Sequence, residues 1–316
     1  MGRLLIRRVA QGIVTVLVVS AITFFLVDLA PGGPGVLARM EMTEEARQAL
    51  IVRLHLHEPA WYRYGRWLGG MLRGDWGRSL ADSRPVTELL ADRLPNTLRL
   101  SATALGLAVA LGVPMAITSA TRPGSAVRML FGLISVAGLS VPSFWLAILL
   151  ILLFSVQLGW LPSSGMGTIG GPPSFVDTLR HTIMPTVVLA ASTLPYVMRF
   201  THSAMLDVLK QDFVRTAVAK GVTPGRVHYR HVLANALGPV ISILGVLVPR
   251  LVGGAIITET IFGWPGIGRL AYDASLGRDY PVILGVTMLV ALVVVACSLL
   301  VDVAHALADP RIRLEG

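Results

Sequence analysis

Residues 212–226 read DFVRTAVAKGVTPGR and lie between two long apolar stretches of the chain. Their pattern predicts a helix, a stop and a second helix. Lys220 falls in what would be the last turn of the first helix, and Gly221 follows where a C-terminal cap requires a positive φ angle. Thr223 then precedes Pro224 as an N-cap residue precedes a proline at the first helical position. Because apolar segments flank this basic element on both sides, we predict that it forms a docking surface for a cytoplasmic partner at a membrane face.

The composition indicates an integral membrane protein. Hydrophobic residues make up 54% of the 316 residues, charged residues make up 14%, and the mean hydropathy is +0.70, values that exclude an ordinary soluble domain. The net charge of +9 would suggest nucleic-acid binding in a soluble chain. Here the basic residues cluster in particular loops between apolar stretches, as orientation signals do, so we expect no nucleic-acid partner. The single cysteine, Cys297, lies in an apolar run and leaves no internal disulfide, Cys-rich metal site or redox motif.

Six apolar stretches are long enough to cross a bilayer as helices, which takes about 20 residues each. They cover residues 9–29, 98–119, 130–158, 183–205, 236–258 and 282–303. The first follows a basic N-terminus, as in a signal peptide, but it is too long for one and no small-residue cleavage site follows it. We therefore expect an uncleaved anchor and an all-α integral membrane protein with six transmembrane helices.

The charges in the short loops orient these helices. The loop over residues 199–231 and the turn over residues 120–128 are rich in Lys and Arg, so both belong in the cytoplasm together with the N-terminus. The loops over residues 159–180 and 259–281 carry no such excess and belong outside. An even number of spans returns the C-terminal tail, residues 306–316, to the cytoplasm. The expected location is the cell membrane, with several passes and both termini cytoplasmic.

The long segment over residues 31–95 contains both acidic and basic residues. We place it on the extracytoplasmic side of the membrane, because long loops are translocated regardless of their charge. Thr43, followed by two glutamates, is expected to cap a short amphipathic helix. A second helix is predicted where apolar and aromatic residues recur at helical spacing, packed on the membrane helices or lying in the interface. These residues are Trp61, Tyr64, Trp67, Leu68, Met71 and Leu72. We interpret the aromatic side chains as packing and interface anchors in preference to a ligand-stacking site.

The basic element resembles the coupling loop of the type I ABC importer permeases. The signature of that loop is Glu-Ala-Ala, three residues, Gly, nine residues and Ile-x-Leu-Pro, and Gly221 occupies the glycine position. The remaining signature positions are held here by Arg215, Thr216, Ala217, His231, Leu233 and Ala234. The core of the signature is present and its edges differ.

Further motifs extend the resemblance over nearly the whole chain. They are WLGGMLRGDWGRS at residues 67–79, RLPNTL at residues 93–98, GGAIITETIFGWPGIGRL at residues 253–270 and RDYP at residues 278–281. Together they are similar to the first membrane subunit of dipeptide, oligopeptide and nickel importers. Residues 31–34, PGGP, depart from that family, which usually has an acid after Pro-Gly, and no role for an acid is supported there.

The resemblance implies the fold of a type I ABC importer permease with an extracytoplasmic insertion after the first helix. The implied domains are an N-terminal transmembrane helix at 1–30, the extracytoplasmic segment at 31–95, a transmembrane type-1 domain at 96–305 with its coupling loop at 206–232, and a cytoplasmic tail at 306–316. It also implies partners, namely a second homologous permease subunit, two cytoplasmic ABC ATPase subunits and an extracytoplasmic substrate-binding protein.

In such permeases a short coupling helix sits in a cleft of the ATPase, whose ATP-driven closure rocks the membrane helices between inward- and outward-facing states. The resemblance implies that ATPase coupling rests on Arg215, Thr216, Ala217, Lys220, Gly221, Pro224 and Arg226. The competing interpretation is a positively charged cytoplasmic loop without such a role. The stop and start signals around Gly221 favour the connector.

Ionisable groups inside membrane spans cost free energy, and they are often functional. Arg250, after Pro249 in the fifth apolar stretch, is the clearest candidate for the translocation pathway, where it would meet a peptide carboxylate. It could instead pair with an acid on a neighbouring helix or extend to the interface. Asp28 and Asp302 lie near the ends of spans, and we interpret them as interfacial.

No catalytic, metal or cofactor site is expected. His55 and His57 are two residues apart and do not share a helical face, and no third ligand lies nearby. The sequence contains no Gly-x-x-x-x-Gly-Lys-Ser/Thr phosphate loop, so ATP hydrolysis must occur in another subunit. Ser163, Ser164 and Gly165 suggest a turn instead of a nucleophile elbow.

The expected function is therefore a permease subunit of an ATP-driven importer of di- or oligopeptides. The same architecture would serve for a nickel chelate, haem or glutathione. An ion-coupled secondary transporter is a more distant alternative. That class would be expected to show inverted repeats, and polar breaks in the helices at the membrane midplane of both halves, and neither is visible in the sequence. An intramembrane hydrolase would need a Ser/His or paired-Asp constellation at membrane depth, which the sequence lacks.

Overall fold

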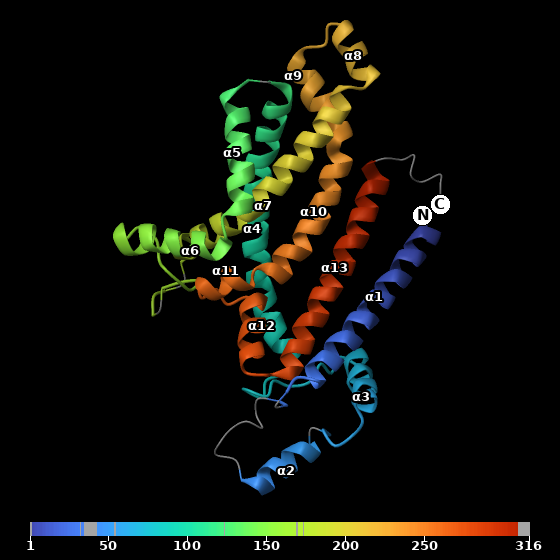
Figure 1. Ribbon diagram of the computed structural model, residues 1–316, viewed down its shortest axis with the longest axis vertical. Coiled ribbons are helices and arrows are strands. Elements are labelled where there is room, and N and C mark those ends of the chain that lie inside the picture. The colour runs from blue at the N-terminus through green and yellow to red at the C-terminus, as the bar shows by residue number, and fades with distance from the viewer. Residues whose placement is uncertain are drawn as a thin grey trace.

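The protein is all-α in a computed structural model that describes residues 2–31, 33–34, 43–53, 55–122, 124–168, 170–172 and 174–308. Five helical runs in these ranges are long and apolar enough to cross a membrane. They are α1 (Gly2–Asp28), α4 (Val86–Thr121), α7 (Phe175–Leu209), the continuous run of α9 (Pro224–Arg226), η3 (Val227–Leu233), α10 (Ala234–Gly254) and α11 (Ile256–Ile261), and α13 (Tyr280–Ala308). Figure 1 shows the long helices side by side in one bundle.

The predicted third span, residues 130–158, is not a straight helix. It is split into α5 (Ala126–Ser140) and a second piece made of α6 (Ser143–Leu150) and the π-helix η2 (Ile151–Gln157), and the two pieces are bent by 102°. The cause is Pro142, which has no N–H to donate and forces the preceding residue out of the helical region. Val141 is accordingly extended, with φ −80° and ψ 119°. The described residues therefore contain five spans, or six if the bent pair counts as one.

The bend sends α6 sideways from the bundle (Figure 1). One face of α6 packs on α7 and α11, where Ala147 is buried beside Val188 and Phe262. Other large apolar side chains of α6 remain open, including Phe144 and Trp145, which are 48% and 50% exposed. With 15 residues, α5 is about 22 Å long, which is shorter than the roughly 30 Å apolar layer of a bilayer.

Small residues bring the helices of the bundle close together. Along α4, one buried residue recurs every four positions, and this stripe consists of Leu100, Ala104, Ala108, Gly112 and Ala116. The stripe packs on α7, where Leu189 and Val197 are also buried. A Cβ atom at Gly112 would lie only 3.1 Å from Val197 Cγ1, so a larger residue there would push the two helices apart.

The segment outside the bundle contributes two helices, α2 (Glu44–Arg53) and α3 (Ala60–Leu72). The predicted aromatic helix is confirmed as α3, which packs on α1. The rings of Tyr64 and Trp67 lie 5.5 and 5.7 Å from that of Phe24, and Tyr64 shares a 2.9 Å hydrogen bond with Ser20. Arg63 forms an ion pair with Asp28 at the end of α1. Of the predicted anchors, Trp61 stays 69% exposed.

A buried carboxylate ties the same segment to the start of α13. Asp279 is 4% exposed, and its Oδ2 accepts hydrogen bonds from Ser79 Oγ at 2.6 Å and from the Leu80 amide at 3.0 Å. The short helix α12 (Ile267–Leu276) ends just before this carboxylate. The segment after α3 is thereby attached to the loop between α12 and α13.

Candidate functional site

The basic element of the sequence forms a helical hairpin at one end of the bundle, far from α2 and α3 (Figure 1). After α7 ends at Leu209, Gln211 adopts an extended conformation and precedes α8 (Asp212–Ala219). A tight turn then leads to α9, which continues through η3 into α10 without a break. The predicted order of helix, stop and second helix is confirmed.

The turn is a Schellman motif centred on Gly221. This glycine has φ +77°, and its amide donates a 2.9 Å hydrogen bond to the Val218 carbonyl. The Val222 amide donates to the Ala217 carbonyl at 3.2 Å. These two hydrogen bonds satisfy the last carbonyls of α8, and the left-handed φ they require is the reason for the glycine.

The restart after the turn follows the predicted pattern in its backbone. Thr223 is extended, with φ −60° and ψ 141°, and Pro224 takes the first position of α9. The Thr223 side chain makes no capping hydrogen bond, so only its backbone serves as the N-cap. The Val227 amide instead donates to the Thr223 carbonyl at 3.0 Å.

The inner face of α8 is fixed to the bundle by apolar packing. Val214 is 4% exposed and belongs to a buried cluster with Val227 and Val232 of η3, Ile117 of α4 and Met205 of α7. Burial of such a side chain stabilises a structure by about 1.5–3 kcal/mol. The inner face of α8 is therefore packed against the helices α4, α7 and η3 through this one cluster.

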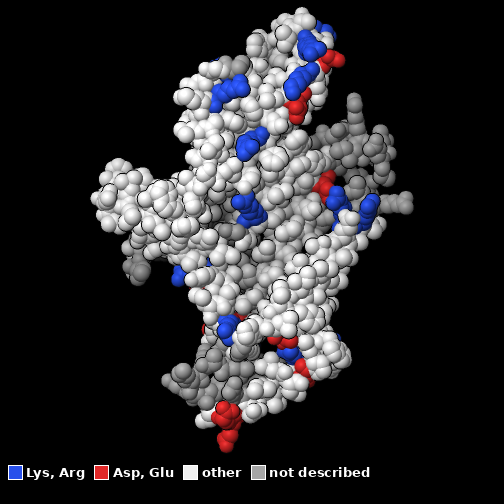
Figure 2. Space-filling model, in the orientation of Figure 1, with Lys and Arg blue, Asp and Glu red and all other residues white. Residues whose placement is uncertain are grey.

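The outer face of α8 and of the turn is exposed and carries both basic and apolar side chains. Of the predicted coupling residues, Arg215, Thr216, Lys220, Gly221, Pro224 and Arg226 are exposed and Ala217 is half-buried. Val218 is 59% exposed on the same hairpin, and Phe213 is 39% exposed. Figure 2 shows Lys and Arg side chains at this end of the molecule, with Asp and Glu side chains beside them. Apolar side chains among exposed basic ones are typical of a surface that binds another protein.

The structure places the predicted pathway residue away from this hairpin. Arg250 follows Pro249 on α10, about six helical turns beyond Arg226. Its guanidinium lies over the ring of Tyr196 in α7, 4.8 Å from the ring centroid. In the described part of the chain, no acid forms an ion pair with Arg250, so the expectation of an acidic partner on a neighbouring helix finds no support. Arg250 is exposed.

Sequence reasoning missed a buried carboxylate between α4 and α12. Glu259 in α11 is completely buried, accepts a hydrogen bond from Thr97 at 2.7 Å and accepts another from the Arg269 amide at 3.0 Å. Cβ atoms at Gly266 and Gly268 would lie 2.3 and 3.0 Å from its carboxylate oxygens. The signal in the sequence was an acid followed by closely spaced glycines, because glycine leaves room for the carboxylate.

The described residues contain no group of three or more His, Cys, Asp or Glu side chains placed to hold a metal ion. His55 lies 3.2 Å from Glu58 as an exposed pair.

Comparisons with known proteins agree with this arrangement. Residues 108–314 match the family described as "Binding-protein-dependent transport system inner membrane component", and residues 1–101 match its N-terminal companion, "Binding-prot-dependent transport system membrane comp, N-term". The chain is 40% identical over 315 residues to the oligopeptide transport system permease protein AppB of Bacillus subtilis (strain 168), covering 99% of this chain and 100% of the relative. It is 38% identical over 316 residues to a Brucella suis biovar 1 chain that bears the name of a peptide transport system permease protein, with both chains covered completely.

A solved structure has the same fold. A chain of the MetNI methionine ABC transporter, in a crystal form with inward-facing conformations, superposes with a TM-score of 0.57 at 19% identity and covers 71% of this chain and 97% of that chain. The predicted all-α membrane fold of the type I ABC importer permeases is confirmed by this likeness.

Proposed function

Because this chain belongs to the family of binding-protein-dependent transport system inner membrane components, we propose that it carries di- or oligopeptides across the membrane as one permease subunit of an importer. The permease assignment rests on the family and on relatives that match over their full length. The names of two of these relatives refer to oligopeptide and peptide transport, which supports peptides as the cargo.

The energy for transport comes from two cytoplasmic ABC ATPase subunits in this proposal. The chain itself has no Gly-x-x-x-x-Gly-Lys-Ser/Thr phosphate loop. A second homologous permease subunit completes the membrane part, and an extracytoplasmic binding protein delivers the peptide. Both termini lie in the cytoplasm, on the side of the α8–α9 hairpin.

The observation that carries the proposal is the hairpin, which combines an anchored inner face with an open outer face. Val214 fixes α8 to residues of α4, α7 and η3, whereas Arg215, Lys220 and Arg226 face outward. An ATPase cleft that holds the outer face would move the hairpin when it closes. The continuous helix from Pro224 into α10 would pass this motion to the membrane-spanning part.

Arg250 is proposed to line the translocation pathway. Its guanidinium has a ring beneath it, at 4.8 Å, and no acidic partner among the described residues. A ring contact leaves the edge of the guanidinium free to bind a carboxylate through two parallel hydrogen bonds. The terminal carboxylate of a peptide is such a group.

The docking role can be tested with a matched pair of substitutions. Val218 on the outer face of α8 and Val52 on α2 are both 59% exposed, so Val218→Glu and Val52→Glu introduce the same charge at equally exposed sites. We expect Val218→Glu to reduce co-purification of the ATPase subunits in detergent and to abolish peptide transport in proteoliposomes. Val52→Glu should retain the ATPases. Equal retention of the ATPases by both variants would contradict the docking role of α8.

The alternatives to peptide transport give different results in the same system. A secondary transporter would transport without ATP and purify without ATPase subunits. A nickel chelate, haem or glutathione importer would keep the ATPases but would have a binding protein that retains that ligand instead of a peptide. Mass spectrometry of the ligand released from the binding protein distinguishes these cargoes.

A further inference from the structure

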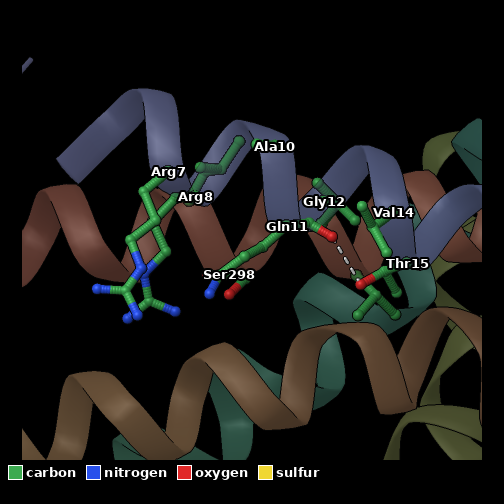
Figure 3. Close-up of a pocket in the computed structure, with 11 residues that line it drawn as sticks. Arg7, Arg8, Ala10, Gln11, Gly12, Val14, Thr15 and Ser298 are labelled. Carbon is green, nitrogen blue, oxygen red and sulfur yellow. Dashed lines mark hydrogen bonds between the residues drawn. The ribbon is translucent and has the colours of Figure 1, made fainter. Parts of the chain in front are cut away.

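We propose that a cleft between α1 and α13 binds an anionic phospholipid, with the phosphate held by Arg7 and Arg8. The cleft has a volume of about 750 Å³ and opens beside the N-terminal part of α1 (Figure 3). It lies away from the α8 hairpin and from Arg250, and it contains no residue used in the proposed coupling or transport steps.

The cleft forms where α1 and α13 meet closely and then separate. A Cβ atom at Gly12 would lie only 2.5 Å from Val295 Cγ1, so the two helices touch at this point. Four polar residues of α1 line the cleft, and three of them, Arg7, Gln11 and Thr15, follow at intervals of four and therefore share one face of the helix. Ser298 lines the cleft from α13.

The end of the cleft nearest the N-terminus is basic. Figure 3 shows the side chains of Arg7 and Arg8 extending from α1 into the open space. Arg8 Nε lies 3.0 Å from Asp302 Oδ2, as an ion pair that lacks hydrogen-bond geometry. Arg7 forms no ion pair with any residue that the structure describes. Two guanidiniums facing one carboxylate leave a net positive charge, which an anion would balance.

The other end of the cleft is apolar. Val14, Val294, Val295 and Leu299 line it, and Val14 and Val294 are 59% and 41% exposed. Seven residues separate Arg7 from Val14, which corresponds to about 10 Å along the helix axis. A phospholipid has the same order of groups, with a phosphate at the surface and acyl chains below it. Gln11 lies between the two ends, and its side-chain amide has no hydrogen-bond partner among the described residues.

The position of the cleft favours a lipid over a soluble anion. Val9 begins the apolar part of α1, so the two arginines lie at the boundary where lipid phosphates lie. Free phosphate would satisfy the guanidiniums but would leave the valines and leucine exposed. Basic pockets between membrane helices on the cytoplasmic side are known to hold anionic headgroups. The choice of the cytoplasmic leaflet rests on the orientation proposed above.

The direct test is native mass spectrometry of the purified importer complex that contains the full chain. Phosphatidylglycerol and phosphatidylcholine with the same acyl chains are added in turn. We expect tighter retention of phosphatidylglycerol and about fivefold weaker retention after Arg7→Gln, the effect typical of one arginine near an anionic surface. Arg128→Gln, which removes another exposed arginine, in the first turn of α5, should leave lipid retention unchanged.

A second variant separates lipid binding from folding. Arg8→Gln alone leaves Asp302 without its partner and is expected to lower the yield of folded complex. Arg8→Gln combined with Asp302→Asn should restore the yield while retention of phosphatidylglycerol stays low. If the double variant binds phosphatidylglycerol as tightly as the wild type, Arg8 has no part in a lipid site.

Photolabelling tests the apolar end. Phosphatidylglycerol with a diazirine on its acyl chain should label the peptide that contains Val294, Val295 and Leu299. The proposal is overturned if phosphatidylcholine is retained equally, if excess inorganic phosphate displaces the lipid completely, or if neither α1 nor α13 is labelled because another subunit fills the cleft. None of these measurements requires transport. Their results for lipid binding could therefore be interpreted even if the peptide-import proposal failed.

Discussion

The hydroxyl of Thr97 in α4 donates a 2.7 Å hydrogen bond to the carboxylate of Glu259 in α11. The same hydroxyl accepts a 2.8 Å hydrogen bond from the Ile267 amide, and the second carboxylate oxygen accepts one of 3.0 Å from the Arg269 amide. Both side chains are completely buried. Two residues from other helices thus satisfy amides in the first turn of α12, which would otherwise have no partner.

Thr97→Val should destabilise the protein, because valine has the shape of threonine without its hydroxyl. The Ile267 amide and one oxygen of Glu259 would lose their partner while buried, which typically lowers stability by about 1–3 kcal/mol. We expect a lower melting temperature of the detergent-solubilised complex. Thr118→Val is the control, since the Thr118 hydroxyl bonds only to the Pro114 carbonyl of its own helix. An unchanged melting temperature for Thr97→Val would show that this hydrogen bond contributes nothing to stability.

Gly221→Val should impair transport through backbone strain alone. A Cβ atom at Gly221 would meet no neighbour within 4 Å, but φ +77° is unfavourable for a residue with a side chain by about 1–2 kcal/mol, or roughly 5–30-fold in the population of the turn. Asparagine tolerates this conformation, so Gly221→Asn should stay near wild type. The measurement is ATPase stimulation by the binding protein, together with peptide uptake in proteoliposomes. Wild-type uptake by Gly221→Val would show that transport does not depend on this turn.

Substitutions of Arg250 should separate a carboxylate-binding role from a structural one. If its guanidinium binds the peptide carboxylate, Arg250→Lys should weaken transport and Arg250→Leu should nearly abolish it, because a point charge does not replace the guanidinium fork. Tyr196→Phe keeps the ring beneath the guanidinium and should have little effect. Transport is measured per assembled complex, with free and carboxy-amidated peptides. A preference for free peptide that persists in Arg250→Leu would exclude the carboxylate role.

Cysteine labelling tests the proposed orientation. Ser83 and Thr223 are both exposed, and they lie on opposite sides of the membrane in the proposed topology. Ser83→Cys should react with a membrane-impermeant thiol reagent in intact cells, whereas Thr223→Cys should react only after permeabilisation. Cys297 is half-buried within α13 and should give a low background in the parent chain. The same reactivity at both positions in intact cells would contradict the topology.

The sequence predicted best where the information is local. The stop at Gly221 and the restart at Pro224 follow from capping chemistry within a few residues, and both are confirmed. Helix ends were less accurate, because hydropathy marks only the apolar part of a helix. The second span was predicted from residue 98, but α4 begins at Val86. The first turns of α4 carry polar residues, which a criterion based on hydropathy leaves out of the span.

Features that depend on tertiary contacts could not be predicted. Thr97 and Glu259 are 162 residues apart in the sequence, and no periodic pattern connects them. The size of the 102° bend after α5 could not be predicted for a different reason, because Pro142 favours a kink or a helix end without fixing its angle. The residues on both sides of Pro142 are equally apolar, so composition does not distinguish one span from two pieces at a large angle. Residues 309–316 of the predicted tail lie outside the described part of the chain.

The π-helix η3 has a consequence for how this family can evolve. Its hydrogen bonds reach back five residues instead of four, so each wide turn contains an extra residue compared with an α-helical turn. An insertion or deletion of one residue between Val227 and Leu233 can therefore be absorbed by converting wide turns to ordinary ones, or the reverse, without rotating α8 relative to α10. His231, one of the positions where the loop signature differs, falls in this stretch. Such a change would alter the number of residues in this stretch while the geometry of the hairpin is retained.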